Sequence, residues 1–133
     1  MEEYFKIKIK NHKGINKKLI FIDYIKNEFK PSSLSVIKEM IKFYKDRLSE
    51  HEEKVIVIFD LRSIKSFDKS MVWAGASELK RHESFFMEHL EKAYLIIENK
   101  FAADTLNLII KIVGTNIENK IVTSIEGVLK DLN

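Results

Sequence analysis

The sequence predicts one α/β domain with a mixed, mostly parallel sheet of four or five strands, wrapped by about four helices. Short apolar runs that are typical of buried strands alternate with stretches whose apolar residues recur at helical spacing. This order implies right-handed crossovers between parallel strands. The 133 residues include one Pro and four Gly, so no flexible linker divides them and a single domain covers residues 1–133.

The first two strands form a predicted hairpin. Phe5, Ile7 and Ile9 alternate with lysines, as in a strand with one face in water, and the row of lysines suits an antiparallel edge strand. A turn over residues 11–16 leads to residues 19–22. That second run is apolar on both faces, so we expect it deeper in the sheet.

The first helix is predicted to begin after Pro31, with a serine from residues 32–33 as its N-cap. Its apolar residues recur at spacings of three and four, while charged residues keep the opposite face in water. Residues 51–53 close the helix. The apolar stripe consists of Leu34, Ile37, Ile41, Tyr44 and Leu48.

A buried strand is predicted at residues 55–59, followed by a long helix from about Lys69. Five consecutive apolar residues are typical of a strand covered on both faces. Either Ser66 or Asp68 can cap the helix, which we expect to bend near residues 82–85. Its buried stripe is predicted to contain Val72, Ala76, Leu79, Phe86 and Leu90.

The C-terminal part repeats the alternation of strand and helix. We predict a buried strand at residues 93–97 and then a third helix, which Asn99 caps and Gly114 ends after Val113. Residues 120–123 form a short strand, and Ser124 caps a last helix through residue 132. The order is therefore strand, strand, helix, strand, helix, strand, helix, strand, helix.

Composition and motifs argue against an enzyme. There is no cysteine, hence no disulfide, thiol nucleophile or thiolate metal site. The sequence contains no P-loop, dinucleotide fingerprint, nucleophile elbow or zinc-protease motif, so we expect no catalytic residue and no cofactor. Glu78, His82 and His89 could share one helix face, but such groups are common on helices, and we expect no metal site.

The net charge is +3, with the excess of lysine in residues 1–30. Only three of the 23 basic residues are Arg, the residue that reads guanine, so we expect no specific nucleic-acid binding. The longest nearly continuous apolar stretch, residues 106–113, contains a Lys and falls well below the ~20 residues of a membrane span. The acidic start does not resemble a secretory signal, and we expect a cytoplasmic protein that is not transmembrane.

Three features suggest binding surfaces. Asp60 follows a buried strand, where open α/β sheets bind ligands, although pairing with Arg62 is the plainer interpretation. Trp73 lies off its helix stripe and either flanks the core or anchors a partner. The third helix is apolar nearly all round, with Leu108 and Ile112 outside its main stripe. It is either buried on several sides or faces a membrane, a lipid or a partner subunit. A homodimer is one way in which the chain could cover this helix.

Residues 55–62, 66–71 and 120–132 resemble the STAS family, whose best-known members are the SpoIIAA-like anti-anti-sigma factors of sporulation. The shared pattern is an apolar strand ending in Asp60-Leu61, a turn at residues 68–71 that opens a helix, and a final strand leading into a last helix. Residues 90–122 also resemble the CRAL-TRIO lipid-transfer fold. Small bacterial STAS/SEC14-like proteins combine both features, and the chain is most similar to them.

The resemblance implies a non-enzymatic regulatory or scaffolding module that binds another protein. In phospho-regulated members, the Ser directly after the motif's Asp accepts the phosphate, but Lys69 stands there in this chain. Beside a helix N-terminus, Lys69 would favour an acidic partner or a phosphate. The partner-binding residues are predicted to be Ser66, Asp68, Lys69, Ser70 and Trp73. The alternative is a small carrier or sensor of a lipid or other apolar ligand, held by Asp60, Phe101, Thr105 and Ile109.

Overall fold

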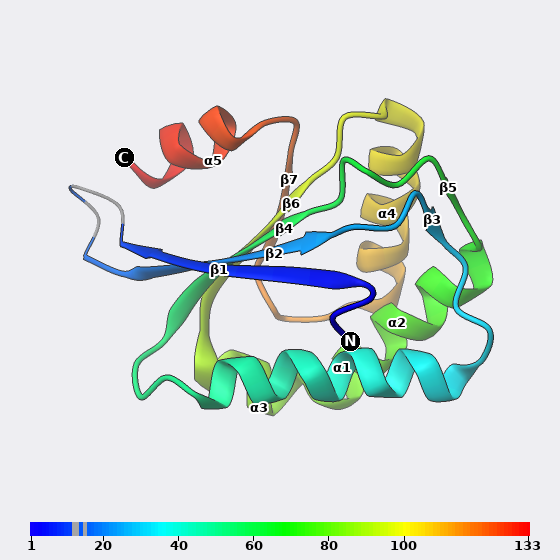
Figure 1. Cartoon of the computed structure of the whole chain (residues 1–133), viewed down its shortest axis with the longest axis horizontal. Helices are drawn as coiled ribbons and strands as arrows, with labels where there is room; N and C mark the ends of the chain where they lie inside the picture. The colour runs from blue at the N-terminus through cyan, green and yellow to red at the C-terminus, as the bar shows by residue number, and fades with distance from the viewer. Residues whose placement is uncertain (12–13, 15) are drawn as a thin grey trace.

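A five-stranded sheet forms the centre of the computed structural model, which describes residues 1–11, 14 and 16–133 (Figure 1). The predicted turn over residues 11–16 includes residues 12, 13 and 15, which lie outside the described residues. The first strand is antiparallel to the second, and the other neighbouring strands are parallel. This confirms the predicted mixed, mostly parallel sheet. Its order is β1 (Phe5–Asn11), β2 (Lys18–Tyr24), β4 (Val55–Asp60), β6 (Leu90–Ile96) and β7 (Asn119–Val122).

Helices cover the two faces of this sheet unequally (Figure 1). One face carries the first four helices found in the described residues, and the other carries the last helix alone. A separate pair of two-residue strands, β3 (Glu28–Phe29) and β5 (Ser66–Phe67), joins the loops that precede α1 and α2. The helices are α1 (Leu34–Ser49), α2 (Lys69–Arg81), α3 (Glu83–His89), α4 (Lys100–Val113) and α5 (Ile125–Leu132).

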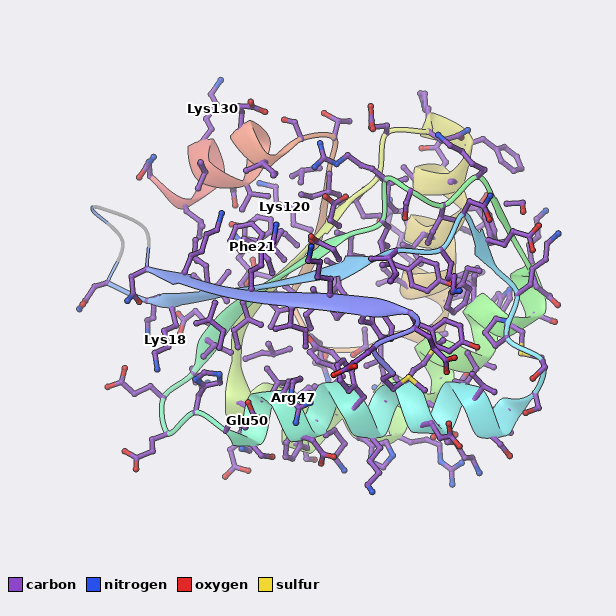
Figure 2. All side chains as sticks on the ribbon, in the orientation of Figure 1. Lys18, Phe21, Arg47, Glu50, Lys120 and Lys130 are labelled. Carbon is purple, nitrogen blue, oxygen red and sulfur yellow. The ribbon has the colours of Figure 1, made fainter. Side chains whose placement is uncertain are left out.

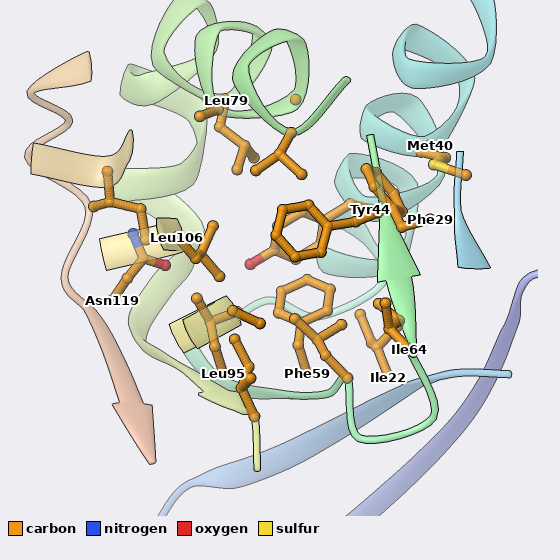
Figure 3. A pocket seen from close by; sticks show the side chains of 18 of the residues that line it. Ile22, Phe29, Met40, Tyr44, Phe59, Ile64, Leu79, Leu95, Leu106 and Asn119 are labelled. Carbon is orange, nitrogen blue, oxygen red and sulfur yellow. The ribbon is translucent and has the colours of Figure 1, made fainter. Parts of the chain in front are cut away.

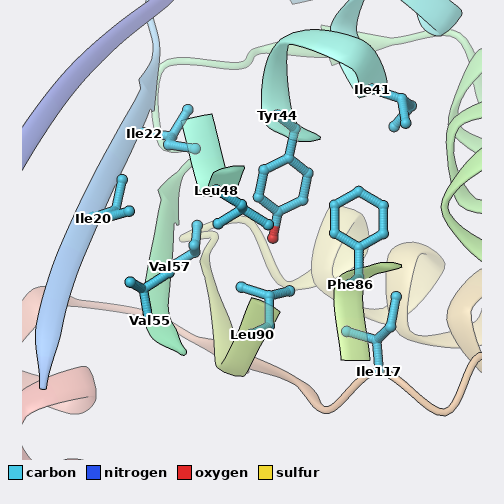
Figure 4. Close-up of a cluster of buried hydrophobic side chains, with 10 residues drawn as sticks. All are labelled: Ile20, Ile22, Ile41, Tyr44, Leu48, Val55, Val57, Phe86, Leu90 and Ile117. Carbon is cyan, nitrogen blue, oxygen red and sulfur yellow. The ribbon is translucent and has the colours of Figure 1, made fainter. Parts of the chain in front are cut away.

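The strands that are apolar on both faces supply two separate cores. In β2, Ile20 and Ile22 pack toward α1 and α3 (Figure 4), whereas Phe21 packs toward α5. Figure 2 shows Phe21 and Lys120 on the same side of the sheet as α5. This alternation follows from the two-residue period of a strand, and it explains why the run has no polar face.

A carboxylate joins α5 to the sheet. Asp131 accepts hydrogen bonds from Tyr94 (2.5 Å) and Lys92 (2.9 Å) on β6, and from Lys120 on β7. These charged bonds hold the pKa of Asp131 well below its usual range. Together with the fully buried Val128, they dock the helix onto an otherwise open face of the sheet.

The predicted helix ends are confirmed in most places. The side chains of Asp68, Asn99 and Ser124 each accept a backbone hydrogen bond at a helix N-terminus. Gly114 ends α4 with a φ of 72°, in the left-handed region where a side chain would be strained. Ser33 occupies the N-cap position of α1 but makes no side-chain capping bond.

The long second helix was predicted wrongly in its last turns. The chain breaks at His82 into α2 and α3, and Leu90 begins β6 instead of continuing a helix. Phe86 and Leu90 are both buried, so the four-residue spacing correctly marked core positions. It gave the wrong secondary structure for Leu90, which lies in a strand. The strand begins three residues before the predicted Ala93 because Leu90 and Lys92 pair with Val55 and Ile56 of β4.

Candidate functional site

An apolar cavity of about 440 Å³ lies between the sheet and the helices α1, α2 and α4 (Figure 3). Its volume falls within the roughly 300–1,000 Å³ of small-molecule pockets. Aliphatic and aromatic side chains from all three helices and from the central strands make up most of its lining. Figure 3 shows Tyr44, Leu79 and Leu106 converging on it from different parts of the chain.

The floor of the cavity includes strand residues that the helices cover only in part. Phe59 on β4 and Leu95 on β6 point toward the helices (Figure 3) and remain partly exposed. Their strand neighbours Ile58, Tyr94 and Ile96, which point to the α5 face, are fully buried. The contrast locates the unfilled volume above the middle of the sheet, on the side of the four helices.

Small residues on two helices create part of this volume. Gly75 and Ala76 on α2 and Ala102 on α4 all line the cavity. A Cβ added at Gly75 would have no heavy atom within 4 Å, so this position opens directly onto empty space. Glycine in the middle of a helix lowers stability by roughly 0.5–1 kcal/mol relative to alanine, and here it leaves room for a ligand.

Most polar side chains of the lining are already engaged within the protein. Arg62 binds Asp60, the Asn99 side chain accepts a hydrogen bond from Ala102 N, and Thr115 Oγ1 accepts one from Ile117 N. Burial raises the pKa of Tyr44, whose hydroxyl therefore stays protonated. Within the described residues, the interior of the cavity thus suits an apolar molecule far better than a charged one.

The cavity reaches the surface at the carboxyl ends of the parallel strands. Lys65 follows β4, Glu98 and Asn99 follow β6, and all three are exposed while also lining the cavity. Open α/β sheets bind ligands at this edge. A ligand with one polar end would therefore place that end beside Lys65 or Glu98 and its apolar part inside.

The residues that we predicted for an apolar ligand do not line this cavity. Phe101 is 66% exposed, Ile109 is buried and Thr105 is partly buried, and neither these three nor Asp60 are among the lining residues. Three of the four predicted residues belong to α4, but the residues of α4 that line the cavity are Ala102, Leu106, Ile110 and Val113. The spacing of Leu106, Ile110 and Val113 was the signal that would have found this face.

Asp60 lies outside the cavity and is bound by Arg62. The guanidinium donates to both carboxylate oxygens, from Nε at 2.9 Å and from Nη2 at 2.7 Å. These bonds lower the pKa of Asp60, whereas burial first and then the neighbouring Asp60 charge raise the pKa of Asp23. Asp23 and Asp60 are register partners on adjacent strands, and the positive charge of Arg62 offsets the repulsion between their carboxylates.

The predicted partner-binding segment surrounds the N-terminus of α2. Asp68 caps the helix, its Oδ1 accepting hydrogen bonds from Ser70 N (2.9 Å) and Ser70 Oγ (2.6 Å). Ser66 belongs to β5 and is not the cap. The Asp68 carboxylate therefore occupies the position that we expected for an anionic partner.

The other two predicted contact residues lie on the first turns of α2. The Nζ of Lys69 lies 5.6 Å from the centre of the Phe101 ring, and Trp73 is 37% exposed. The role of these residues in partner binding stays a prediction.

Neither metal sites nor membrane spans were found in the part of the chain that the structure describes. No group of three His, Asp or Glu side chains there could hold a metal ion. Glu78 lies 3.8 Å from His82, while His89 donates from Nδ1 to the carbonyl oxygen of Phe85. None of the described helices is long and apolar enough to cross a bilayer.

The arrangement of strands and helices defines the class of fold: an α/β domain with a SpoIIAA-like fold. The chain is similar to the solved structure of an uncharacterized DUF3478-family protein from Shewanella loihica, which is described as having that fold. The TM-score is 0.64 at 10% sequence identity, over 98% of this chain and 94% of the other. At this identity the likeness shows the fold alone, and it confirms the STAS-type resemblance at that level. No protein-family model and no curated protein matches the chain.

Proposed function

We propose that this chain is a non-enzymatic binding domain that holds one small apolar molecule between its sheet and helices, as a carrier or a sensor. The observation that supports this proposal is the apolar cavity of about 440 Å³. Burying apolar ligand surface there gains roughly 25 cal/mol per Å². The small volume favours a single-chain amphiphile or a compact hydrophobic molecule.

Gly75 provides a direct test. Gly75→Leu places a side chain into the open space beside it, in a helix where leucine is a better former than glycine. With cis-parinaric acid as the fluorescent probe, we expect the wild type to bind and Gly75→Leu to bind at least about tenfold more weakly, a loss of about 1.4 kcal/mol. The melting temperature should be unchanged or higher.

Gly75→Ala is the matched control, because it makes the same change in backbone freedom but fills much less volume. It should stabilise the chain and keep most of the probe binding. Equal binding by Gly75→Leu and the wild type would contradict the proposal, as would a wild type that binds no probe. Extraction of the protein purified from cells, followed by mass spectrometry, would then identify the natural molecule.

A second candidate function is a regulatory or scaffolding module that binds another protein beside α2. Lys69 and the exposed aromatic residues Trp73 and Phe101 support it, since exposed aromatic side chains are frequent interface anchors. Lys69→Glu should leave thermal stability nearly unchanged and abolish pull-down of the partner. If the variant retains every protein that the wild type captures, the partner binds elsewhere.

A further inference from the structure

We propose that the outer face of α4 binds the same face of a second copy of this chain, with the two helices antiparallel. This face, called here the α4 stripe, consists of Phe101, Thr105, Leu108 and Ile112. Phe101, Leu108 and Ile112 are 66%, 58% and 60% exposed, a large apolar exposure for one helix. The inner side of the same helix lines the cavity, so the proposal is independent of the proposed ligand.

The spacing of the α4 stripe makes it self-complementary. Its members are separated by four, three and four residues, which reads the same in both chain directions. Residues three and four apart share a helix face, so the four side chains form one row. In an antiparallel pair, Phe101 meets Ile112 of the second copy, and Thr105 meets its Leu108. Each large apolar side chain of the row thereby gains a neighbour.

The charges beside the stripe favour the same arrangement. Asp104 and Lys111 are seven residues apart and lie on one flank of the row. In an antiparallel pair equal flanks face each other, so Asp104 lies beside Lys111 of the second copy, and this ion pair occurs twice by symmetry. In a parallel pair, the two copies of this flank would lie on opposite sides of the helix–helix contact, and Asp104 could not reach Lys111 of the second copy. In the single chain, Asp104 forms an ion pair with Lys100 at 3.0 Å. Both side chains are mostly exposed, so Asp104 can exchange this partner for Lys111 of the second copy.

The position of α4 leaves room for this contact. The helix packs against α2 and is the last helix of its layer (Figure 1). The pair of Asp104 and Lys111 suits a second copy of the same face, because that copy offers the opposite charge to each of them. A second copy of this chain is therefore the occupant that spacing and charge together favour.

Sedimentation tests the contact. We expect the wild type to form dimers, and Leu108→Lys to raise the dimer Kd by at least about tenfold. Asn107→Lys is the matched control, since it adds the same side chain at the adjacent, exposed position outside the stripe. Asp104→Lys and Lys111→Asp should each weaken the dimer, and the double variant should restore it. A wild type that stays monomeric at high concentration overturns the proposal.

Disulfide trapping tests the direction of the helices, and the absence of native cysteine makes it clean. A mixture of Phe101→Cys and Ile112→Cys proteins should cross-link under oxidation. Phe101→Cys alone should not, because the two positions would lie about 16 Å apart along the helix axis at 1.5 Å per residue. Cross-linking of Phe101→Cys alone overturns the antiparallel pair. A flotation assay with phosphatidylcholine vesicles tests the membrane alternative. If the wild type is monomeric and floats with the vesicles, this face binds a membrane and the proposal is overturned.

Discussion

The hydroxyl of Tyr94 donates a 2.5 Å hydrogen bond to the carboxylate of Asp131, and so links a fully buried residue of β6 to the C-terminal helix. Lys92 and Lys120 donate to the same carboxylate. One acidic side chain therefore gathers donors from two strands, and the docking of α5 depends on its charge.

Asp131→Asn should lower the melting temperature by several degrees at pH 7. Because the folded state lowers the pKa of Asp131, its contribution is present above the unfolded value of about 4 and is lost as pH falls below it. The difference between variant and wild type should therefore shrink in acid. Glu91→Gln, at an exposed ion pair with Lys17, is the control and should change the melting temperature little.

Arg62→Met should destabilise the carboxyl ends of β2 and β4. Without the guanidinium, Asp23 and Asp60 face each other as two carboxylates, so both pKa values should rise. The stability loss is largest at neutral pH, where both groups are ionised, and decreases as pH falls and one of them takes up a proton. NMR titration of the two carboxyl groups measures the shifts. Adding Asp60→Asn to the variant should recover stability, and failure to recover would contradict the repulsion.

Asp68→Ala should cost about 1 kcal/mol of unfolding free energy, the usual effect of losing an N-cap. Ser66→Ala should cost less, because Ser66 lies in β5 and does not cap the helix. Chemical denaturation of the two variants side by side checks this. A larger loss for Ser66→Ala would mean that the capping assignment is wrong.

Phe86→Ala should be among the most damaging substitutions in the chain. The side chain is completely buried, packs against Tyr44 and also lines the cavity, so its removal enlarges a space that is already unfilled. We expect a loss of roughly 3–5 kcal/mol. Phe101→Ala, which removes the same ring from an exposed position, should leave the unfolding free energy of the monomer nearly unchanged.

The strands and helices with strong local patterns could be predicted from the sequence. The apolar run of β4, the stripe of α1 and the caps Asp68 and Asn99 each depend on residues close together in the chain. The pair β3 and β5 could not be found this way, because each strand has two residues and exists through pairing with a distant segment. The early start of β6 likewise depends on pairing with a distant segment, the start of β4.

The candidate site was harder to predict than the fold. Its walls come from four helices and from strands and loops spread along the chain, and no single stretch of sequence carries a signal for empty volume. Apolar periodicity identifies which residues face inward, but not whether their side chains meet. Gly75 is the one local hint, since a glycine in the middle of a stable helix needs a reason.

An unfilled space above the sheet also has a consequence for how this chain can be studied. A molecule that binds in this space binds the native state and not the unfolded chain. At a concentration of 100 times its Kd, it therefore raises the free energy of unfolding by about 2.7 kcal/mol. The thermal midpoint is therefore an assay that requires no knowledge of the biological role. A library of hydrophobic metabolites could be ranked by melting temperature, with Gly75→Leu protein identifying compounds that act outside the cavity.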